Sequence, residues 1–215
     1  MYKKSLLFFC LLFSQAALAV VPVDGMVSEC SPYPELKNNS VMPLRFNTTN
    51  NLSVADKSGF YEAEGQKITV YGRVMDANCV PIGDAKILIW QANKAGYIQY
   101  EAKDVSKPKW VDPNFNGTGI VNTDNMGRFS FVTIMPGSSS KRYTPYINIK
   151  VEHPKLKNLY SKIFFAKKNV KRVRDKKSMK TSTISALVSA VPAVNKANSY
   201  YIDITMHQAV PYKEY

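Results

Sequence analysis

The stretch that decides the fold spans residues 67–76 and reads KITVYGRVMD. Its apolar residues Ile68, Val70 and Val74 fall on one face at period 2, which is typical of a strand with one buried side. Residues 77–84 contain asparagine, proline and glycine, the residues of a turn, and residues 86–90, KILIW, form a second and more fully apolar strand. The two segments are therefore predicted to pair as a β-hairpin.

Downstream, a polar excursion lasts until Gly119 and predicts a long loop. Further strands are predicted near 128–133, 146–152, 159–165 and 200–206, and the spacing of apolar residues at 183–194 favours a short helix ending near Pro192. These patterns indicate an all-β fold, an antiparallel β-sandwich with long loops and an N-terminal arm. The predicted core consists of Ile68, Val70, Val74, Ile87, Ile89, Phe129, Phe131, Ile147, Ile149, Ile202 and Ile204.

The same region resembles the intradiol ring-cleavage dioxygenases, especially the protocatechuate 3,4-dioxygenase type. The order and spacing of its motifs match over residues 72–137. The residues that carry the resemblance are Gly72-Arg73-Val74-Met75-Asp76, Pro81-Ile82, Ala85, Ile89-Trp90-Gln91-Ala92-Asn93, Asp112-Pro113-Asn114-Phe115, Gly119, Thr123-Asp124, Gly127, Phe129-Ser130-Phe131, Thr133-Ile134 and Pro136-Gly137. Residues 159–165 and 201–206 are similar to two later strands of the family.

The resemblance implies a non-haem ferric ion held by two tyrosines and two histidines, with an open position for a catecholate. Fe(III) is a hard ion that favours anionic oxygen ligands and accepts imidazole beside them. The family's ligand positions fall here on Tyr97, Ser139, Tyr146 and Asn148, where Tyr97 requires a one-residue deletion and the ungapped position is Ile98. At most one of the four ligands is therefore retained. We therefore predict no cofactor, and Fe(III) only if the chain is active. A rearranged metal site is an alternative, and it would use Tyr97, Tyr143, Tyr146 and His153.

The N-terminus has the composition of an export signal. Lys3 and Lys4 precede an apolar run at 5–13, and Ala17-Leu18-Ala19 has the small-any-small form of a signal-peptidase site. We predict a signal peptide at 1–19, an arm with loops at 20–66 and the dioxygenase-like domain at 67–215. The protein is expected to be periplasmic or secreted, with no transmembrane segment after cleavage, because the apolar run is shorter than the about 20 residues that span a bilayer.

Two cysteines remain after that cleavage, Cys30 and Cys79. In an oxidising compartment an even number of cysteines predicts a disulfide between them, and two separate thiols are the alternative. We expect this disulfide to attach the N-terminal arm to the first pair of strands.

The chain is basic, with a formal net charge of +13, and its cations concentrate in one segment. We predict an exposed loop there that binds an anionic envelope component or an acidic protein, and a solvated loop is the alternative. Nucleic acid is not expected, because the aromatic residues used for base stacking are missing from the segment. The basic residues are Lys167, Lys168, Lys171, Arg172, Arg174, Lys176, Lys177 and Lys180.

Three functions are compatible with these features. The first is a non-catalytic member of the dioxygenase fold, an exported pseudoenzyme that serves as a binding or structural component of the cell envelope. The second is an active Fe(III)-dependent dioxygenase acting on a catechol-type aromatic, which the scaffold motifs favour. The third is a carbohydrate- or lipid-binding β-sandwich. A fold does not carry a function without its site, so the residues at the ligand positions distinguish the first two.

Overall fold

The computed structural model describes residues 30, 33–35, 42–54, 61–98, 111–138, 144–165 and 189–207. These ranges contain eight strands and no helix, and therefore no helix that could span a membrane. The strands are β1 (Lys67–Met75), β2 (Lys86–Gln91), β3 (Thr118–Asn122), β4 (Arg128–Ile134), β5 (Tyr146–Glu152), β6 (Leu159–Phe165), β7 (Ser189–Pro192) and β8 (Ser199–Thr205).

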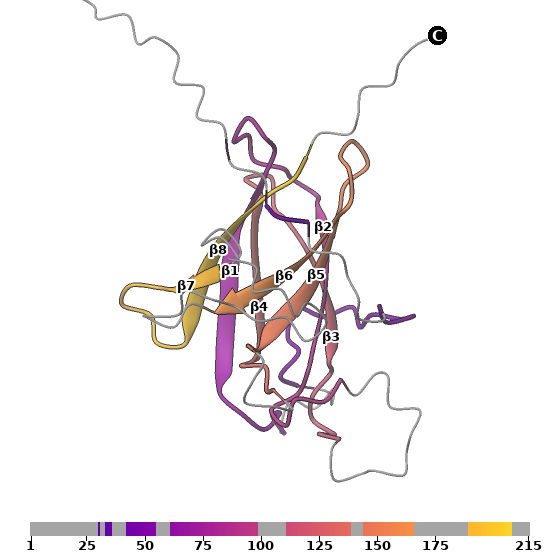
Figure 1. Ribbon diagram of the computed structural model, residues 1–215, viewed down its shortest axis with the longest axis vertical. Coiled ribbons are helices and arrows are strands. Elements are labelled where there is room, and N and C mark those ends of the chain that lie inside the picture. The colour runs from indigo at the N-terminus through magenta and orange to yellow at the C-terminus, as the bar shows by residue number, and fades with distance from the viewer. Residues whose placement is uncertain are drawn as a thin grey trace, which may run out of the picture.

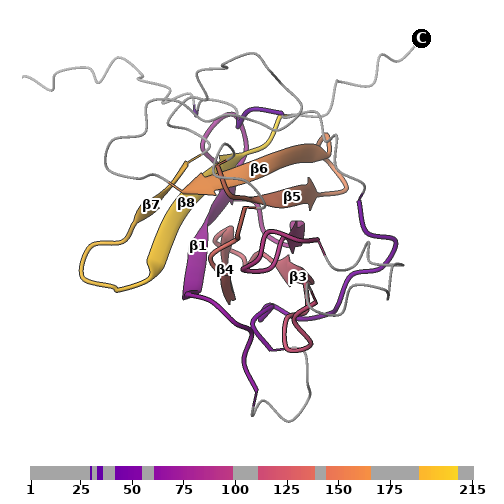
Figure 2. The ribbon, with the colours of Figure 1, turned by 60° about the horizontal axis from the view of Figure 1, so that its bottom comes forward.

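The strands follow one another in the hydrogen-bonded order β3-β2-β5-β6-β7-β8-β1-β4. The half formed by β3, β2, β5 and β6 curls over the half formed by β8, β1 and β4, and short β7 joins the two (Figure 1, Figure 2). The predicted all-β sandwich is confirmed. Two pairings differ from a purely antiparallel arrangement, because β1 pairs with β8 and β6 pairs with β7 in parallel.

The interior is built from the alternating apolar residues of both halves. In β1, Ile68, Val70 and Val74 point inward and are buried, while Thr69 and Tyr71 lie on the outer side and are partly exposed. Every residue of the predicted core is buried. Burying one such side chain stabilises the fold by about 1.5–3 kcal/mol, so the alternation that predicted the strands also stabilises them.

The predicted hairpin of β1 and β2 is wrong. Both edges of β1 are occupied, one by β4 and the other by β8, so β2 has no edge of β1 to pair with and lies in the other half between β3 and β5. The connection first turns tightly, since Asn78 N and Val80 N both donate to the Asp76 carboxylate at 2.8 and 2.9 Å. The chain then crosses to the other half of the sandwich, where the Asp84 amide donates to the Thr123 carbonyl at 3.2 Å.

Two strands were not predicted. The helix expected at 183–194 is wrong where the structure describes it, because residues 189–192 form β7; residues 183–188 lie outside the described residues. β7 is four residues long and pairs with both β6 and β8, a role that a helix could not fill. β3 begins at the end of the predicted long loop and forms the edge beside β2.

The described part of the N-terminal arm packs on the sandwich. Leu52 is fully buried, and its amide donates to the Val132 carbonyl at 2.8 Å. Asn51 forms an isolated parallel bridge with Val132, on the edge strand β4. The ring of Phe46 meets Trp90 edge-on, with centroids 5.8 Å apart. The arm thus covers edge and face groups that would otherwise meet water.

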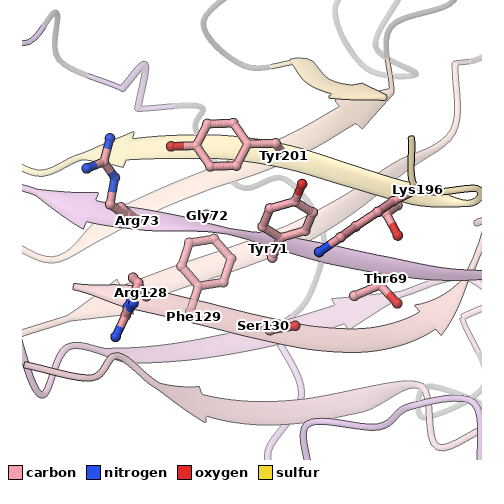
Figure 3. Close-up of a pocket in the computed structure, with 10 residues that line it drawn as sticks. Thr69, Tyr71, Gly72, Arg73, Arg128, Phe129, Ser130, Lys196 and Tyr201 are labelled. Carbon is pink, nitrogen blue, oxygen red and sulfur yellow. The ribbon is translucent and has the colours of Figure 1, made fainter. Parts of the chain in front are cut away.

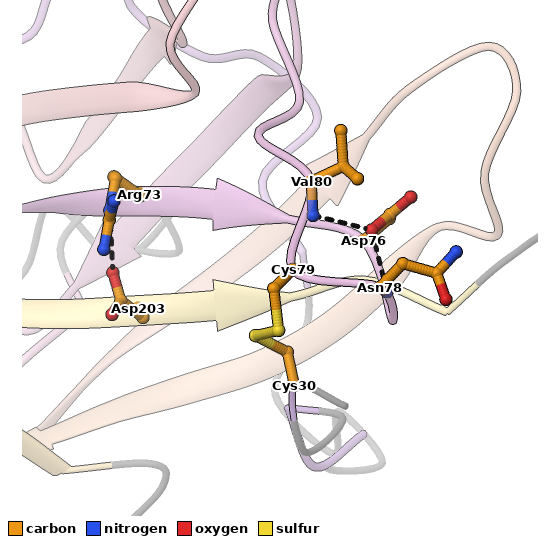
Figure 4. Close-up of a disulfide and its surroundings, with 7 residues drawn as sticks. All are labelled: Cys30, Arg73, Asp76, Asn78, Cys79, Val80 and Asp203. Carbon is orange, nitrogen blue, oxygen red and sulfur yellow. Dashed lines mark hydrogen bonds and ion pairs between the residues drawn. A yellow bond between two sulfur atoms is a disulfide. The ribbon is translucent and has the colours of Figure 1, made fainter. Parts of the chain in front are cut away.

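The predicted disulfide between Cys30 and Cys79 is present, with 5.2 Å between the two Cα atoms (Figure 4). Cys79 lies in the turn that follows β1, and the Cys30 amide donates to the Ala77 carbonyl at 3.2 Å. The disulfide therefore attaches the start of the described chain to the end of β1 rather than to a hairpin.

Candidate functional site

The two positions at which the resemblance implies histidine lie at the start of β5. They are Tyr146, which is half-buried, and Asn148, which is buried. Successive residues of a strand point to opposite faces, so these two share one face while Ile147 and Ile149 enter the apolar core on the other. The two positions thus lie side by side on one face, as a pair of ligands would, but they carry tyrosine and asparagine in place of the histidines that the resemblance implies.

Asn148 is held by its neighbours across the sheet. The strand register places it directly between Trp90 on β2 and Lys162 on β6. Its side-chain amide nitrogen donates to the Trp90 carbonyl at 3.2 Å. A buried amide engaged in this way serves as a polar link between strands and is a poor ligand for Fe(III) compared with imidazole.

Lys162 is the unexpected residue of this site. Its side chain is buried, at 3% exposure, and its ammonium lies 4.3 Å from the ring centroid of Tyr146. Cation–π contacts of this kind contribute about 2 kcal/mol when they are desolvated. The Lys162 backbone is anchored as well, because the hydroxyl of the fully buried Tyr33 donates to the Lys162 carbonyl at 3.0 Å. Burial raises the pKa of Tyr33, so this hydroxyl keeps its proton and remains a donor.

A second lysine follows the same pattern one step along β5. Lys150 lies opposite Tyr160 on β6, with its ammonium 5.1 Å from the ring centroid, and it forms an ion pair with Glu152. Burial disfavours the charged ammonium, but hydrogen bonds to Glu152 and Tyr160 outweigh it and raise the pKa of Lys150. The outer face of β5 and β6 therefore carries two cations, each placed against a tyrosine ring.

The indole nitrogen of Trp90 adds an unsatisfied donor to this region. Nε1 is buried and has no hydrogen-bond partner among the residues that the structure describes. Buried polar groups are almost always paired, so an orphaned one calls for an explanation. The ring gains its contacts from Phe46 instead.

These residues do not fit the ferric ion that the resemblance implies. A metal site needs electron-pair donors, whereas the ammonium of Lys162 has none to give and repels a cation. Two unit charges about 4 Å apart repel each other by about 4 kcal/mol at an effective dielectric constant of about 20. Within the described ranges, no three His, Cys, Asp or Glu side chains gather as a metal site.

Two of the other predicted site residues, His153 and Tyr97, lie within the described ranges. His153 follows the far end of β5, seven residues from Tyr146 and about 23 Å along an extended strand, so these two side chains cannot share an ion. The His153 Nδ1 accepts a hydrogen bond from the Lys155 amide at 3.3 Å, so this side chain stabilises the turn that follows β5. Tyr97 is exposed in the turn after β2, where its amide donates to Asn93 Oδ1 at 3.1 Å. Ser139, Tyr143 and the eight basic residues of 167–180 lie outside the described residues.

The family motif after β2 serves the scaffold. Gln91 is buried and joins the two halves of the sandwich, since its side-chain nitrogen donates to the Ile134 carbonyl at 2.8 Å and Thr133 Oγ1 donates to its oxygen at 2.8 Å. Asn93 accepts from the Gly137 amide at 2.9 Å. These contacts give the motif a structural role that needs no metal.

Comparisons with known proteins bear on the same scaffold. The family model described as Dioxygenase matches residues 41–207. The chain belongs to the intradiol dioxygenase family. It is 35% identical over 176 residues to a Rickettsia typhi protein that is provisionally named a dioxygenase, covering 78% of this chain and 82% of that one. It is also 40% identical over 96 residues to the protocatechuate 3,4-dioxygenase beta chain of Burkholderia cepacia, covering 45% of this chain and 38% of that one.

Solved structures support the fold. The intradiol ring-cleavage dioxygenase of Tetranychus urticae superposes with a TM-score of 0.62 at 20% identity, covering 83% of this chain and 95% of that one. At this identity the likeness concerns the sandwich alone. Within the intradiol family, this chain combines the shared scaffold with Tyr146, Asn148 and Lys162 on the outer face of β5 and β6.

Sequence reasoning identified Tyr146 and Asn148 but missed Lys162. A signal was available in the strand 159–165, LYSKIFF, because a lysine within a strand that is apolar on both sides is expected to be buried and therefore to need a partner. The partner itself, Tyr146, could be found only from the register of β5 against β6.

Proposed function

We propose that this chain is an exported, non-catalytic member of the intradiol dioxygenase family that serves as a binding or structural component of the cell envelope. The observation that carries the proposal is the buried ammonium of Lys162 above the ring of Tyr146, directly across from Asn148. In this chain a tyrosine and an amide stand at the two positions where the family resemblance implies histidine ligands, and a protein cation lies beside them. Ring cleavage by the family's chemistry requires the metal, so a chain that cannot hold it has a different use.

Export is supported by the sequence and by the cross-link. The lysines, apolar run and Ala17-Leu18-Ala19 of the first 19 residues have the order of a signal peptide. The disulfide between Cys30 and Cys79 suits an oxidising compartment. The basic segment 167–180 then supplies positive charge for an anionic partner in the envelope.

An active Fe(III) dioxygenase is the second candidate, favoured by the retained scaffold motifs and by the enzymes among the relatives. The two are separated by purifying the protein from cells grown with added iron. We expect less than about one-tenth of an equivalent of iron, no visible tyrosinate-to-iron absorption, and no oxygen uptake with catechol or protocatechuate. A stoichiometric, coloured iron protein that consumes oxygen would establish the enzyme and overturn the proposal.

A rebuilt site tests the role of Lys162 directly. Tyr146→His with Asn148→His places two imidazoles at i and i+2 on one face of β5, a spacing that can chelate Ni²⁺ or Zn²⁺. We expect this double variant to bind Ni²⁺ at least about tenfold more weakly than the triple variant that also carries Lys162→Gln. The reason is that the double variant keeps the Lys162 ammonium, which repels the ion, whereas the triple variant lacks it. The Lys162→Gln single variant is the matched control, and equal affinity in the double and triple variants would show that Lys162 does not exclude the metal.

A further inference from the structure

A second cluster of aromatic and charged residues lies on the outer face of β4, β1 and β8, on the half of the sandwich opposite to Lys162. The strand register aligns side chains of these three strands in rows across the sheet. One row consists of Ser130, Tyr71 and Tyr201, and the next of Arg128, Arg73 and Asp203. None of these side chains belongs to the apolar core.

A groove of about 440 Å³ lies over these rows (Figure 3). Its lining includes the rings of Tyr71 and Tyr201, the cations Arg73, Arg128 and Lys196, and the hydroxyl groups of Thr69, Ser130 and Ser199. Because it lies on the outer side of a sheet, it can cover one face of a ligand and leave the other in water. A flat aromatic ligand gains most from a site that encloses both of its faces, and this groove offers only one.

The two tyrosine rings form a corner rather than a stack. Their centroids are 5.5 Å apart and their planes are inclined by 66°. The Tyr201 hydroxyl donates to Asp203 Oδ1 at 2.5 Å, which holds that ring in place. Burial and the hydrogen bond to Asp203 raise the pKa of Tyr201, so its hydroxyl stays protonated at neutral pH. The negative ring faces attract the positively polarised C–H groups of a pyranose ring, and the nearby hydroxyls suit its polar edge.

The charges around the groove leave one positive charge in excess. Arg73 lies 3.7 Å from the Asp203 carboxylate, and Arg128 lies 2.8 Å from that of Asp124. Lys196 belongs to none of the ion pairs among the described residues, and its ammonium lies 5.7 Å from the centroid of Tyr71. A ligand that rests on Tyr71 would therefore contact this ammonium (Figure 3).

We propose that this groove binds an acidic saccharide, with a pyranose ring on the Tyr71 and Tyr201 corner and a carboxylate at Lys196. The assignment deepens the proposed envelope-binding function by naming a ligand class, and it concerns a surface separate from β5 and β6. Iron and oxygen-uptake measurements can therefore overturn the non-catalytic role without touching this site. Failure of saccharide binding would overturn this assignment alone.

The test is calorimetric titration of the purified protein with two trisaccharides, the acidic trigalacturonate and the neutral maltotriose, and with the monosaccharide glucose 6-phosphate. We expect trigalacturonate to bind at least about tenfold more tightly than maltotriose, since a hydrogen bond to a charged group contributes more than one between neutral groups. Tighter binding of the sugar phosphate than of the uronate would overturn the carboxylate assignment. The proposal as a whole would be overturned if maltotriose bound as tightly as trigalacturonate. It would also be overturned if no probe gave heat at about 10 mM, a concentration far above typical specific dissociation constants.

Two variants with matched controls locate the site. Lys196→Gln and Tyr71→Ala should each weaken trigalacturonate binding by about tenfold. Lys196→Arg keeps the charge and Tyr71→Phe keeps the ring, so both should bind within about threefold of the natural chain. Lys196 is exposed, so Lys196→Gln does not put folding at risk. Undiminished binding in Lys196→Gln would contradict the placement of the carboxylate, whatever Tyr71→Ala does to the fold.

Discussion

Removal of the disulfide between Cys30 and Cys79 should destabilise the protein by an amount that the structure allows us to estimate. The cross-link closes a separation of 49 residues, and the chain-entropy relation gives about 4 kcal/mol at 25 °C for a loop of that length. Urea unfolding followed by circular dichroism measures the loss. With a urea dependence of about 2 kcal/mol per M, the midpoint should fall by about 2 M in the variant Cys30→Ser with Cys79→Ser.

The backbone at Cys79 provides a matched control. Its φ of 64° lies in the left-handed region, where a non-glycine residue costs about 1–2 kcal/mol. The variant Cys30→Ser with Cys79→Gly lacks the same cross-link but relieves that cost, so it should be about 1 kcal/mol more stable than the double serine variant.

Two results would refute this reasoning. A midpoint shift below about 0.5 M in both variants would mean that the cross-link constrains little of the unfolded chain. Identical midpoints for the serine and glycine variants would mean that the turn at Cys79 changes its backbone once the disulfide is gone. Reduction of the natural chain with a thiol should reproduce the double serine variant, since it removes the same cross-link.

The remaining predictions concern the scaffold and its surface. Gly72→Ala should destabilise the protein by about 3 kcal/mol or more in thermal unfolding, because an added Cβ would lie 1.6 Å from a carbonyl oxygen of β8. Gly83→Ala is the control and should cost under about 1 kcal/mol, because its Cβ would lie 3.3 Å from the nearest atom. Leu52→Ala should cost about 2–5 kcal/mol in urea unfolding, and a loss below about 1 kcal/mol would show that the arm is not part of the core. Hydrogen bonds from the backbone and side chain of Arg128 lower the pKa of Asp124, so NMR titration should place it below the ordinary aspartate range. Its contribution to stability should be present at neutral pH and be lost as the pH falls through that lowered pKa, and a normal or raised Asp124 pKa would contradict the turn geometry.

Much of the fold follows from local patterns. Alternation at Ile68, Val70 and Val74 predicted β1 and its buried face, because one residue in two must enter the core of a sandwich. The motif residues around Gln91 predicted the family, and they now prove to be hydrogen-bonding partners that join the two halves. The alternation is readable from sequence because the face on which a strand residue lies depends on its neighbours along the chain, whereas the partners of Gln91 are distant in sequence and are known only from the structure.

The sequence by itself determined the set of buried faces and the disulfide partners. Which strands pair was decided only in three dimensions, since both edges of β1 are taken by distant strands and β2 must pair elsewhere. The partner of Lys162 was decided in the same way, because the register of β5 against β6 brings its ammonium over Tyr146. A strand can form backbone hydrogen bonds with any other strand edge, so local sequence predicts that a strand forms but not which strand lies beside it. Competition among all the strand edges of the fold selects that neighbour.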